Sequence, residues 1–123
     1  MQPGDAEILY LEDEIIVALD TAQTLTELGF TTVHLCHNLR RAQALSEQLS
    51  PGDFALLDVN IAGEGLSIDL GRDLAARGVR VVFASGYNRH EMEAEHARLT
   101  FVEKPLTADT IRDAFARLEA SAD

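Results

Sequence analysis

Residues 53–60, DFALLDVN, form the stretch that decides how the rest of the chain is arranged. Its unbroken apolar run, residues 54–57, is typical of a strand covered on both faces in the interior of a parallel sheet. The carboxylate of Asp58 closes that run. Ligands bind at the carboxyl ends of the strands in an open α/β sheet, so Asp58 is predicted to lie at a site of chemistry. Taken alone, Asp58 is better explained as an ordinary turn aspartate.

Strand-like and helix-like segments alternate on both sides of this stretch. Further strands are expected at 7–11, 31–35, 80–84 and 99–103, and helices at 15–28, 39–49, 66–76, 88–98 and from 107 onward. The segment 88–98 is charged and poor in large apolar side chains, so we expect the fourth helix to be short or marginal. The alternation of five strands with five helices predicts an α/β fold with a doubly wound parallel sheet.

Composition limits the possible classes of function. A chain of 123 residues is one domain of ordinary size, and none of its apolar runs approaches the length that spans a membrane. The single cysteine, Cys36, and a start without signal-peptide features favour a cytoplasmic location. A net charge of −11 repels nucleic acid and anionic lipid, so neither is expected as a direct partner.

Polar side chains follow four of the five expected strands. Glu12 and Asp13 follow the first strand and Asp58 closes the third, while Ser85 and Lys104 follow the fourth and fifth. The ends of parallel strands lie along one edge, so three carboxylates would crowd a small space unless positive charge were present. Lys104 and one Mg²⁺ ion together would balance them. Mg²⁺ takes one or two carboxylates together with water and phosphate oxygens, which predicts a magnesium- and phosphate-handling site.

A carboxylate, a divalent cation and an ammonium group together suggest transfer of a phosphoryl group onto aspartate. In that interpretation Asp58 attacks, Lys104 neutralises the developing charge, and the hydroxyl of Ser85 donates to a phosphoryl oxygen. The acids at 12–14 have a simpler explanation as residues favoured at the start of a helix. Their combination with Asp58 and Lys104 favours the site.

Four short motifs, ILYLED at 8–13, DVN at 58–60, FASGY at 83–87 and Lys104-Pro105, resemble those of response-regulator receiver domains in two-component signalling. The resemblance covers residues 8–118, and the motifs occur in the family's order and approximate spacing. It implies a CheY-like, flavodoxin-like fold with strand order 2-1-3-4-5. It also implies Mg²⁺-dependent phosphorylation by a phosphohistidine donor, either a sensor histidine kinase or a histidine phosphotransfer protein.

The resemblance also assigns roles by position. It makes Asp58 the phosphoacceptor, with Glu12, Asp13 and the backbone carbonyl of Asn60 completing the protein's metal ligands. Ser85 takes the place of the switch hydroxyl, Lys104 that of the family's lysine, and Phe101 that of the rotating aromatic. The bond between Lys104 and Pro105 is typically cis in the family, a rigid turn that aims the ammonium group. Without the resemblance, Phe101 is simply a core aromatic, and Tyr87 is either a partner contact or an exposed side chain.

The sequence departs from the common family pattern at several positions. Glu12 stands where aspartate is commoner, and Ser85 where threonine is, which removes the stiffness of a β-branched side chain. The loop after Asp58 has Ala62 and Gly63 in the region of a usual proline, which predicts greater loop mobility. The segment between Ser85 and Lys104 is shorter than in most members, so the mode of output is the least defined part of the resemblance.

The leading hypothesis is a phosphorylation-controlled signalling domain rather than an enzyme, with residues 1–123 forming a single receiver domain without an output domain. Its phosphorylation would pull the loop toward Ser85 and Lys104, bury Phe101 and switch contacts with a downstream protein. One alternative is an interaction module that is never phosphorylated. Another is a phosphatase or phosphotransferase with an aspartyl-phosphate intermediate, which is disfavoured because Asn60 stands where a general acid would be needed.

Overall fold

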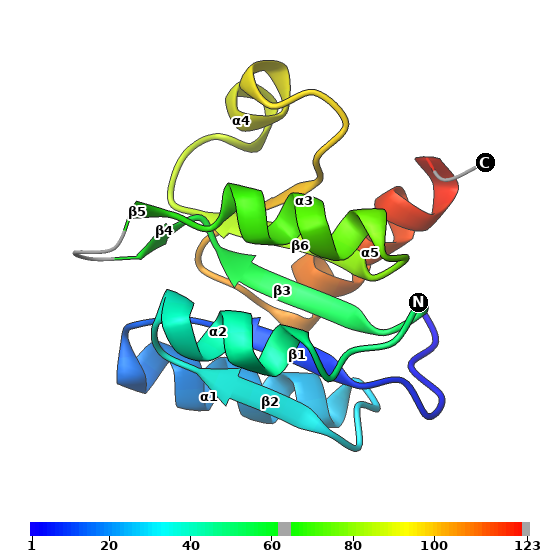
Figure 1. Ribbon diagram of the computed structural model, residues 1–123. Coiled ribbons are helices and arrows are strands. Elements are labelled where there is room, and N and C mark those ends of the chain that lie inside the picture. Colours follow the sequence, from blue (N-terminus) through cyan, green and yellow to red (C-terminus); the bar gives the residue numbers. More distant parts are fainter. Residues whose placement is uncertain (62–64, 122–123) are drawn as a thin grey trace.

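The computed structural model describes residues 1–61 and 65–121 and contains a five-stranded parallel sheet (Figure 1). The predicted loop mobility at Ala62 and Gly63 concerns residues outside the described ranges. The sheet consists of β1 (Ile8–Leu11), β2 (Val33–Cys36), β3 (Phe54–Asp58), β6 (Arg80–Ser85) and β7 (Phe101–Glu103). Their order is β2-β1-β3-β6-β7, and every neighbouring pair is parallel. Counting only these five strands gives the predicted order 2-1-3-4-5, so the fold prediction is confirmed.

Helices cover both faces of the sheet. They are α1 (Ile15–Glu27), α2 (Leu39–Ser46), α3 (Ile68–Ala76), α4 (Arg89–Glu95) and α5 (Ala108–Ser121). In Figure 1, α2 and α3 lie in front of the sheet and α1 and α5 behind it. The alternation of side chains along β3 supplies both layers, because Phe54 and Leu56 join the core under α1 and α5 while Ala55 and Leu57 join the other. All four side chains are fully buried, as the unbroken apolar run predicts.

Local capping explains where several helices begin. The side chain of Asn38 accepts a hydrogen bond from the backbone N–H of Arg41 at 2.8 Å, as predicted for the start of the second helix. Thr107 caps α5 in the same way through the N–H of Thr110, at 3.1 Å. The fourth helix has only seven residues, and Met92 is its one buried side chain, which confirms the prediction of a short helix.

The third predicted helix begins later than expected. Residues 65–66 form the short strand β5 (Gly65–Leu66), which pairs antiparallel with β4 (Asn60–Ile61). The helix therefore starts at Ile68 rather than Leu66. Two-residue strands carry no periodic signal, and for this reason the sequence pattern did not reveal them. Other differences are shifts of element ends: α2 stops at Ser46, β2 starts at Val33, and β7 starts at Phe101.

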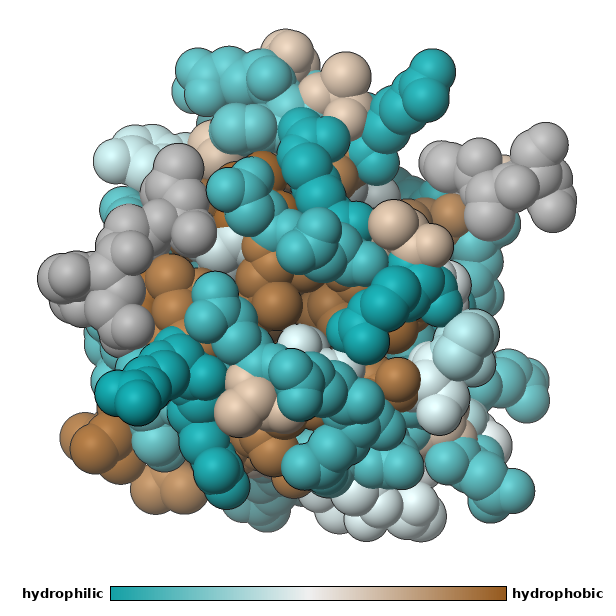
Figure 2. All heavy atoms as spheres, viewed as in Figure 1, coloured by the Kyte–Doolittle hydropathy of each residue, from teal (hydrophilic) through white to brown (hydrophobic). Residues whose placement is uncertain are grey.

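One group of aliphatic side chains remains on the surface, at the beginning of α1. Ile15, Ile16 and Leu19 have 62%, 84% and 60% of their surface exposed. The space-filling view in Figure 2 shows apolar side chains at this corner of the molecule, beside polar ones. Within the described ranges, no helix has the length and apolar character required to cross a membrane.

Candidate phosphoryl-transfer site

The parallel sheet places the predicted site residues along one rim. Glu12 and Asp13 follow β1, Asp58 is the last residue of β3, and Ser85 is the last of β6. Lys104 follows β7, which is paired with β6 so that Glu103 lies beside Ser85. All strands run in the same direction, so each brings its polar residue to the same edge.

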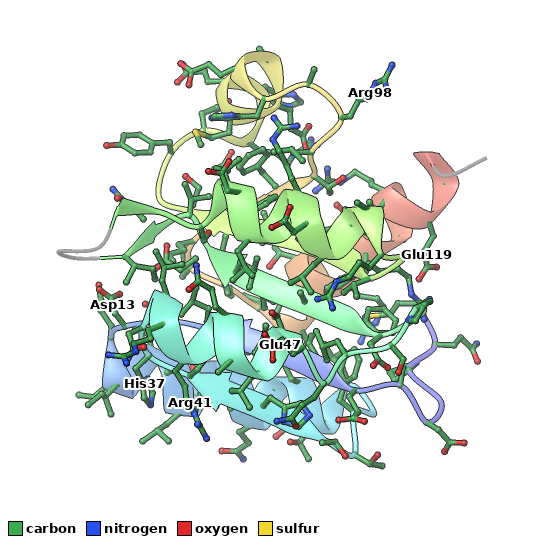
Figure 3. The ribbon with its side chains drawn as sticks, in the orientation of Figure 1. Asp13, His37, Arg41, Glu47, Arg98 and Glu119 are labelled. Carbon is green, nitrogen blue, oxygen red and sulfur yellow. The ribbon has the colours of Figure 1, made fainter. Side chains whose placement is uncertain are left out.

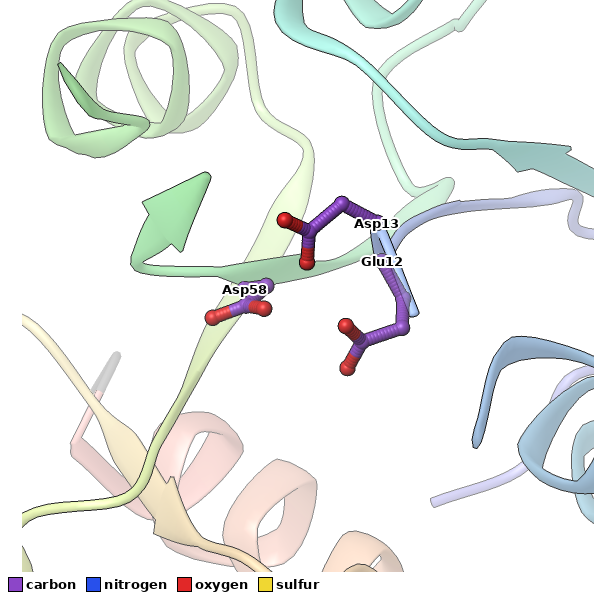
Figure 4. A group of neighbouring side chains, drawn as sticks. All are labelled: Glu12, Asp13 and Asp58. Atoms are coloured by element: carbon purple, nitrogen blue, oxygen red, sulfur yellow. The ribbon is translucent and has the colours of Figure 1, made fainter. Parts of the chain in front are cut away.

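The three carboxylates converge, as Figure 4 shows. One oxygen from each of Glu12, Asp13 and Asp58 can be chosen so that all three lie within 4.8 Å of one another. The exposed fraction is only 1% for Glu12 and 5% for Asp58. Two nearly buried negative charges at such close range are unfavourable unless a cation lies between them.

Lys104 provides one such cation. Its Nζ donates to Asp58 Oδ2 at 3.0 Å and lies 2.9 Å from Glu12 Oε1. Burial alone would lower the pKa of Lys104, but its bonds to the Glu12 and Asp58 carboxylates outweigh burial and raise that pKa. Burial raises the pKa of Glu12, and the bond from Lys104 opposes that shift. The bond between Lys104 and Pro105 is cis, as the resemblance to receiver domains predicts.

The donor set also fits a hard divalent cation. The buried Glu12 Oε1 contacts Lys104 Nζ at 2.9 Å, and a carboxylate oxygen can bind a second cation through its other lone pair. It therefore retains capacity for another positively charged ligand. Three carboxylates and one ammonium group leave two negative charges, which a divalent cation neutralises. Carboxylate oxygens are the ligands that Mg²⁺ and Ca²⁺ prefer.

Two residues that follow Asp58 in the chain form hydrogen bonds with it and fix its position. The backbone N–H of Asn60 donates to Asp58 Oδ1 at 3.2 Å, and the hydroxyl of Ser67 donates to the Asp58 carbonyl at 2.7 Å. Ser67 is fully buried, and sequence reasoning missed it because residue 67 was expected inside a helix. His37 was also missed: its Nδ1 lies 2.9 Å from the carbonyl of Glu12.

A cavity of about 900 Å³ opens from this rim toward α4. Asp58, Ser85 and Lys104 line it, and so do Met92 and His96 of the α4 region. The hydroxyl of Ser85 accepts the N–H of Tyr87 at 3.0 Å, while the side chain of Tyr87 is 66% exposed. The cavity thus joins the acidic cluster to an open space beside an exposed aromatic ring.

Phe101, the predicted rotating aromatic, lies inside the core in this structure. Its ring is fully buried, stacked on Phe83 with 5.4 Å between ring centres. The prediction that phosphorylation buries Phe101 stays a prediction, and in this conformation the ring is already inside the core. Phe101 can equally well be a core aromatic, as its sequence context alone suggested.

The site can now be compared with known proteins. Neither a scan against protein-family models nor a search of curated proteins gave a match. Solved structures did. SdrG from Sphingomonas melonis Fr1 is 31% identical over 93% of this chain and 96% of its own, with a TM-score of 0.75. The response regulator PhyR from Brucella abortus is 26% identical over 94% of this chain and 50% of its own, with a TM-score of 0.74.

A third structure adds chemical detail. It is a response regulator from Burkholderia pseudomallei with a phosphorylated aspartic acid and a calcium ion, 20% identical over 96% of this chain and 73% of its own, with a TM-score of 0.72. The fold and the rim of acids define a CheY-like α/β signalling domain. The chain belongs to the receiver domains of response regulators.

Proposed function

We propose that this chain is a phosphorylatable receiver domain, with Asp58 as the residue that accepts the phosphoryl group. The observation that carries the proposal is the position of Lys104 Nζ, 3.0 Å from Asp58 Oδ2 and 2.9 Å from Glu12 Oε1. An ammonium group in bonding contact with a nearly buried acceptor carboxylate is arranged to neutralise charge on an incoming phosphoryl group. The phosphorylated aspartate of the Burkholderia regulator supports the same assignment.

The transfer is a displacement at phosphorus. A carboxylate oxygen of Asp58 forms the new bond to phosphorus while the bond to the donor's histidine nitrogen breaks, and the imidazole leaves with that electron pair. Lys104 donates to a phosphoryl oxygen, and Ser85, at the end of the neighbouring strand, presents a hydroxyl to another. Glu12, Asp13 and the Asn60 carbonyl would hold Mg²⁺, which would offset the charge of the phosphoryl oxygens. The domain assists only its own phosphorylation and dephosphorylation.

The test is incubation with Mg²⁺ and acetyl phosphate, followed by intact-protein mass spectrometry. We expect a single phosphate on the wild type and none on Asp58→Asn. Asp53→Asn is not a suitable control, because Asp53 bonds two backbone N–H groups and supports the fold. Asp73→Asn, on an exposed position of α3, is the matched control and should be phosphorylated normally. Absence of an adduct on the wild type, or an equal one on Asp58→Asn, would refute the assignment.

The partner expected upstream is a protein that carries phosphohistidine, a sensor histidine kinase or a histidine phosphotransfer protein. The exposed aliphatic side chains of Ile15, Ile16 and Leu19 follow directly after Asp13 and Glu14, which line the cavity with Asp58. A donor that packs on this patch would bring its histidine to the rim. Ile16→Asp should therefore slow transfer from a phosphorylated histidine phosphotransfer protein and leave labelling by acetyl phosphate unchanged.

Its output is a change of protein contacts, in a cytoplasmic pathway. Comparison of proteins recovered with the wild type, with and without the phosphoryl mimic beryllofluoride, should reveal a downstream partner whose binding depends on the mimic. Asp58→Asn should recover the same proteins under both conditions. Recovery that does not depend on beryllofluoride would favour a constitutive interaction module instead.

A further inference from the structure

The imidazole of His37 lies beside the phosphoryl-transfer rim, just outside the acidic cluster. Its Nδ1 is 2.9 Å from the backbone carbonyl of Glu12, which follows β1. A carbonyl oxygen can only accept, so Nδ1 carries the proton and donates it to this bond. His37 therefore reaches, across 25 positions of the chain, the segment that supplies two of the three converging carboxylates.

The backbone of His37 is fixed on both sides. Before it, the carbonyl of Cys36 accepts the backbone N–H of Glu12 at 3.0 Å, which continues the pairing of β2 with β1 by one residue. After it, Asn38 caps α2 by accepting the N–H of Arg41 at 2.8 Å. The end of a strand and the start of a helix thus determine where the His37 side chain begins. The imidazole needs little further ordering to form its bond, which keeps the entropic cost of that bond low.

The carboxylate of Glu12 is held by contacts that do not involve His37. Its Oε1 contacts Lys104 Nζ at 2.9 Å, and its Oε2 accepts the backbone N–H of Glu14 at 3.1 Å. The side chain of Glu12 is also almost fully buried. We therefore do not expect the position of this carboxylate to depend on the imidazole.

Asp13 is the acid that the His37 bond controls. The carbonyl of Glu12 belongs to the same planar peptide unit as the N–H and Cα of Asp13. Holding the carbonyl oxygen therefore fixes the direction in which Asp13 leaves the end of the strand. Figure 3 shows His37 and Asp13 at the same edge of the molecule, and Figure 4 shows the Asp13 carboxylate on the side of Asp58. His37 thus acts on the acidic cluster through the backbone.

The position of Asp13 affects how well the three carboxylates can enclose a divalent cation. Mg²⁺ requires near-octahedral geometry at short oxygen distances, whereas Ca²⁺ accepts more variable arrangements. Groups that bond the ligands of a metal, rather than the metal, commonly set its affinity. The bond from His37 to a neutral carbonyl is a single hydrogen bond of an exposed side chain, so its contribution should be moderate.

We propose that His37 is a positioning residue for the divalent cation, because its bond to the Glu12 carbonyl orients Asp13 toward the site shared with Asp58. This inference rests on the proposed function, since it concerns the cation of the same site. It gives His37 a role in the affinity for Mg²⁺ and none in the displacement at phosphorus.

The test is titration of the metal-free protein with Mg²⁺, followed by tyrosine fluorescence, because Tyr87 lines the cavity that contains Asp13 and Asp58. His37→Ala should weaken Mg²⁺ binding about three- to tenfold, and Ca²⁺ binding by less. His37→Asn should restore most of the affinity, because its amide nitrogen is as many bonds from Cα as Nδ1 and can donate to the same carbonyl. Labelling of His37→Ala by acetyl phosphate should be slow at limiting Mg²⁺ and equal to that of the wild type at saturating Mg²⁺.

The control is a histidine away from the rim. His90 is exposed on α4 and contacts Arg89, so His90→Ala should bind Mg²⁺ as the wild type does. A purely structural role of His37 would lower the metal-free stability, measured by urea unfolding, and leave the Mg²⁺ affinity unchanged. A wild type that binds no Mg²⁺ would refute the metal site of the proposed function and this inference with it. Unchanged affinity in His37→Ala, no recovery in His37→Asn, or an equal loss in His90→Ala would overturn this inference alone.

Discussion

Among single residues, Lys104 has the charge on which the stability of the site depends most. It is the only lysine of the chain, and its ammonium group contacts two carboxylates that are almost fully buried. Without it, Glu12 and Asp58 would face each other with no cation among the described side chains in contact with both. Removing one partner of a buried ion pair destabilises the fold more than replacing the whole pair with apolar side chains. The charge that remains is still desolvated but no longer has a partner.

Lys104→Met should therefore destabilise the metal-free protein by about 3 kcal/mol at neutral pH, the lower end for a buried pair because the side chain of Lys104 is 25% exposed. The loss should shrink on acidification, since burial already raises the pKa of Glu12 and protonation removes its charge. Urea unfolding with a chelator present, at neutral and mildly acidic pH, measures both effects. A variant as stable as the wild type at neutral pH would contradict this account of the site.

Two buried weak acids, Cys36 and Tyr10, determine how the stability of the fold changes at alkaline pH. Burial raises the pKa of Cys36 from 9.0 to about 12, and burial likewise raises the pKa of Tyr10 from 10.0 to about 12. Well below pH 9 both groups are protonated in the folded and unfolded chain, so they do not affect stability there. Above it, the unfolded chain loses the Cys36 proton first, and stability must fall as the pH rises.

The free energy of unfolding should thus decline between pH 9 and about 12. Cys36→Ala should make the decline shallower, by at most about 1.4 kcal/mol per pH unit, although the cavity it leaves lowers stability at every pH. The comparison therefore concerns slopes from urea titrations, not absolute values. Parallel slopes for the two proteins would show that Cys36 does not titrate as its burial requires.

At the scale of elements, α3 and β6 are joined by an unusually close contact. A Cβ built on Gly71 of α3 would meet Cζ of Phe83 at 2.1 Å and Cε1 at 2.6 Å. The ring of Phe83 is fully buried and stacked on Phe101, so it has little room to move. The small residue at 71 is needed for this approach of helix to sheet, and not for a special backbone conformation.

Gly71→Ala should accordingly destabilise the protein, although alanine is the better helix former. The helix gains about 1 kcal/mol from alanine. Overpacking costs about 1–3 kcal/mol, and a contact as short as 2.1 Å belongs at the upper end. Urea unfolding and near-ultraviolet circular dichroism would measure the loss and the disturbed aromatic packing. Ala75→Gly, at an exposed position of the same helix, is the control and should lose stability without an aromatic signal.

The side chain of Glu93 ties the short helix α4 to two neighbouring elements. Glu93 Oε2 accepts the backbone N–H of Phe101 and a guanidinium N–H of Arg117, each at 3.1 Å, so it links α4 to β7 and α5. A seven-residue helix has little intrinsic stability, and these tertiary contacts must supply it. Phe101 and α5 keep most of their other packing without Glu93.

Glu93→Ala should loosen α4 and leave the global fold in place. Amide protons of α4 should exchange faster with solvent, while those of β1 and β3 keep the protection of the wild type. Hydrogen exchange followed by mass spectrometry resolves the two regions. The matched variant Glu91→Ala removes an exposed charge from the same helix and should change little. Equal exchange of α4 in both variants would show that Glu93 is not its anchor.

The comparison of sequence with structure is also clearest at the level of elements. The run 54–57 was a sufficient signal, because only a strand covered on both faces buries four consecutive apolar residues, and the strand ends then had to share one rim. The hairpin of β4 and β5 was too short to leave a pattern. The sequence did not decide whether Phe101 is a rotating aromatic or a core residue, because a ring in that strand has apolar surroundings on either face of the sheet. The bond from His37 to the Glu12 carbonyl could not be found, since the two residues are 25 positions apart and no periodic pattern links them.

For the whole molecule, charge distribution is the dominant property. The chain has a net charge of −11, and in two regions the local charge differs from the average of the surface. The rim concentrates negative charge from Glu12, Asp13 and Asp58. A second cavity, bordered by the start of β6 and the end of α5, concentrates positive charge from four arginines, Arg80, Arg89, Arg98 and Arg117. A divalent cation would bind at the rim through three converging carboxylates. The net negative charge would attract it only weakly to the rest of the surface. Stability measurements can separate these two effects.

Mg²⁺ should raise the thermal stability of the wild type by more than NaCl of equal ionic strength. A ligand at a hundred times its dissociation constant stabilises by about 2.7 kcal/mol, and a surface screening effect is smaller and saturates differently. Asp13→Asn removes one ligand of the acidic cluster, so this variant should lose most of the Mg²⁺ effect. Asp73→Asn, which lowers the negative charge equally at an exposed position of α3, should retain the full Mg²⁺ response. If both variants responded alike, Mg²⁺ would be acting on the net charge of the molecule, and the rim would not be a metal site.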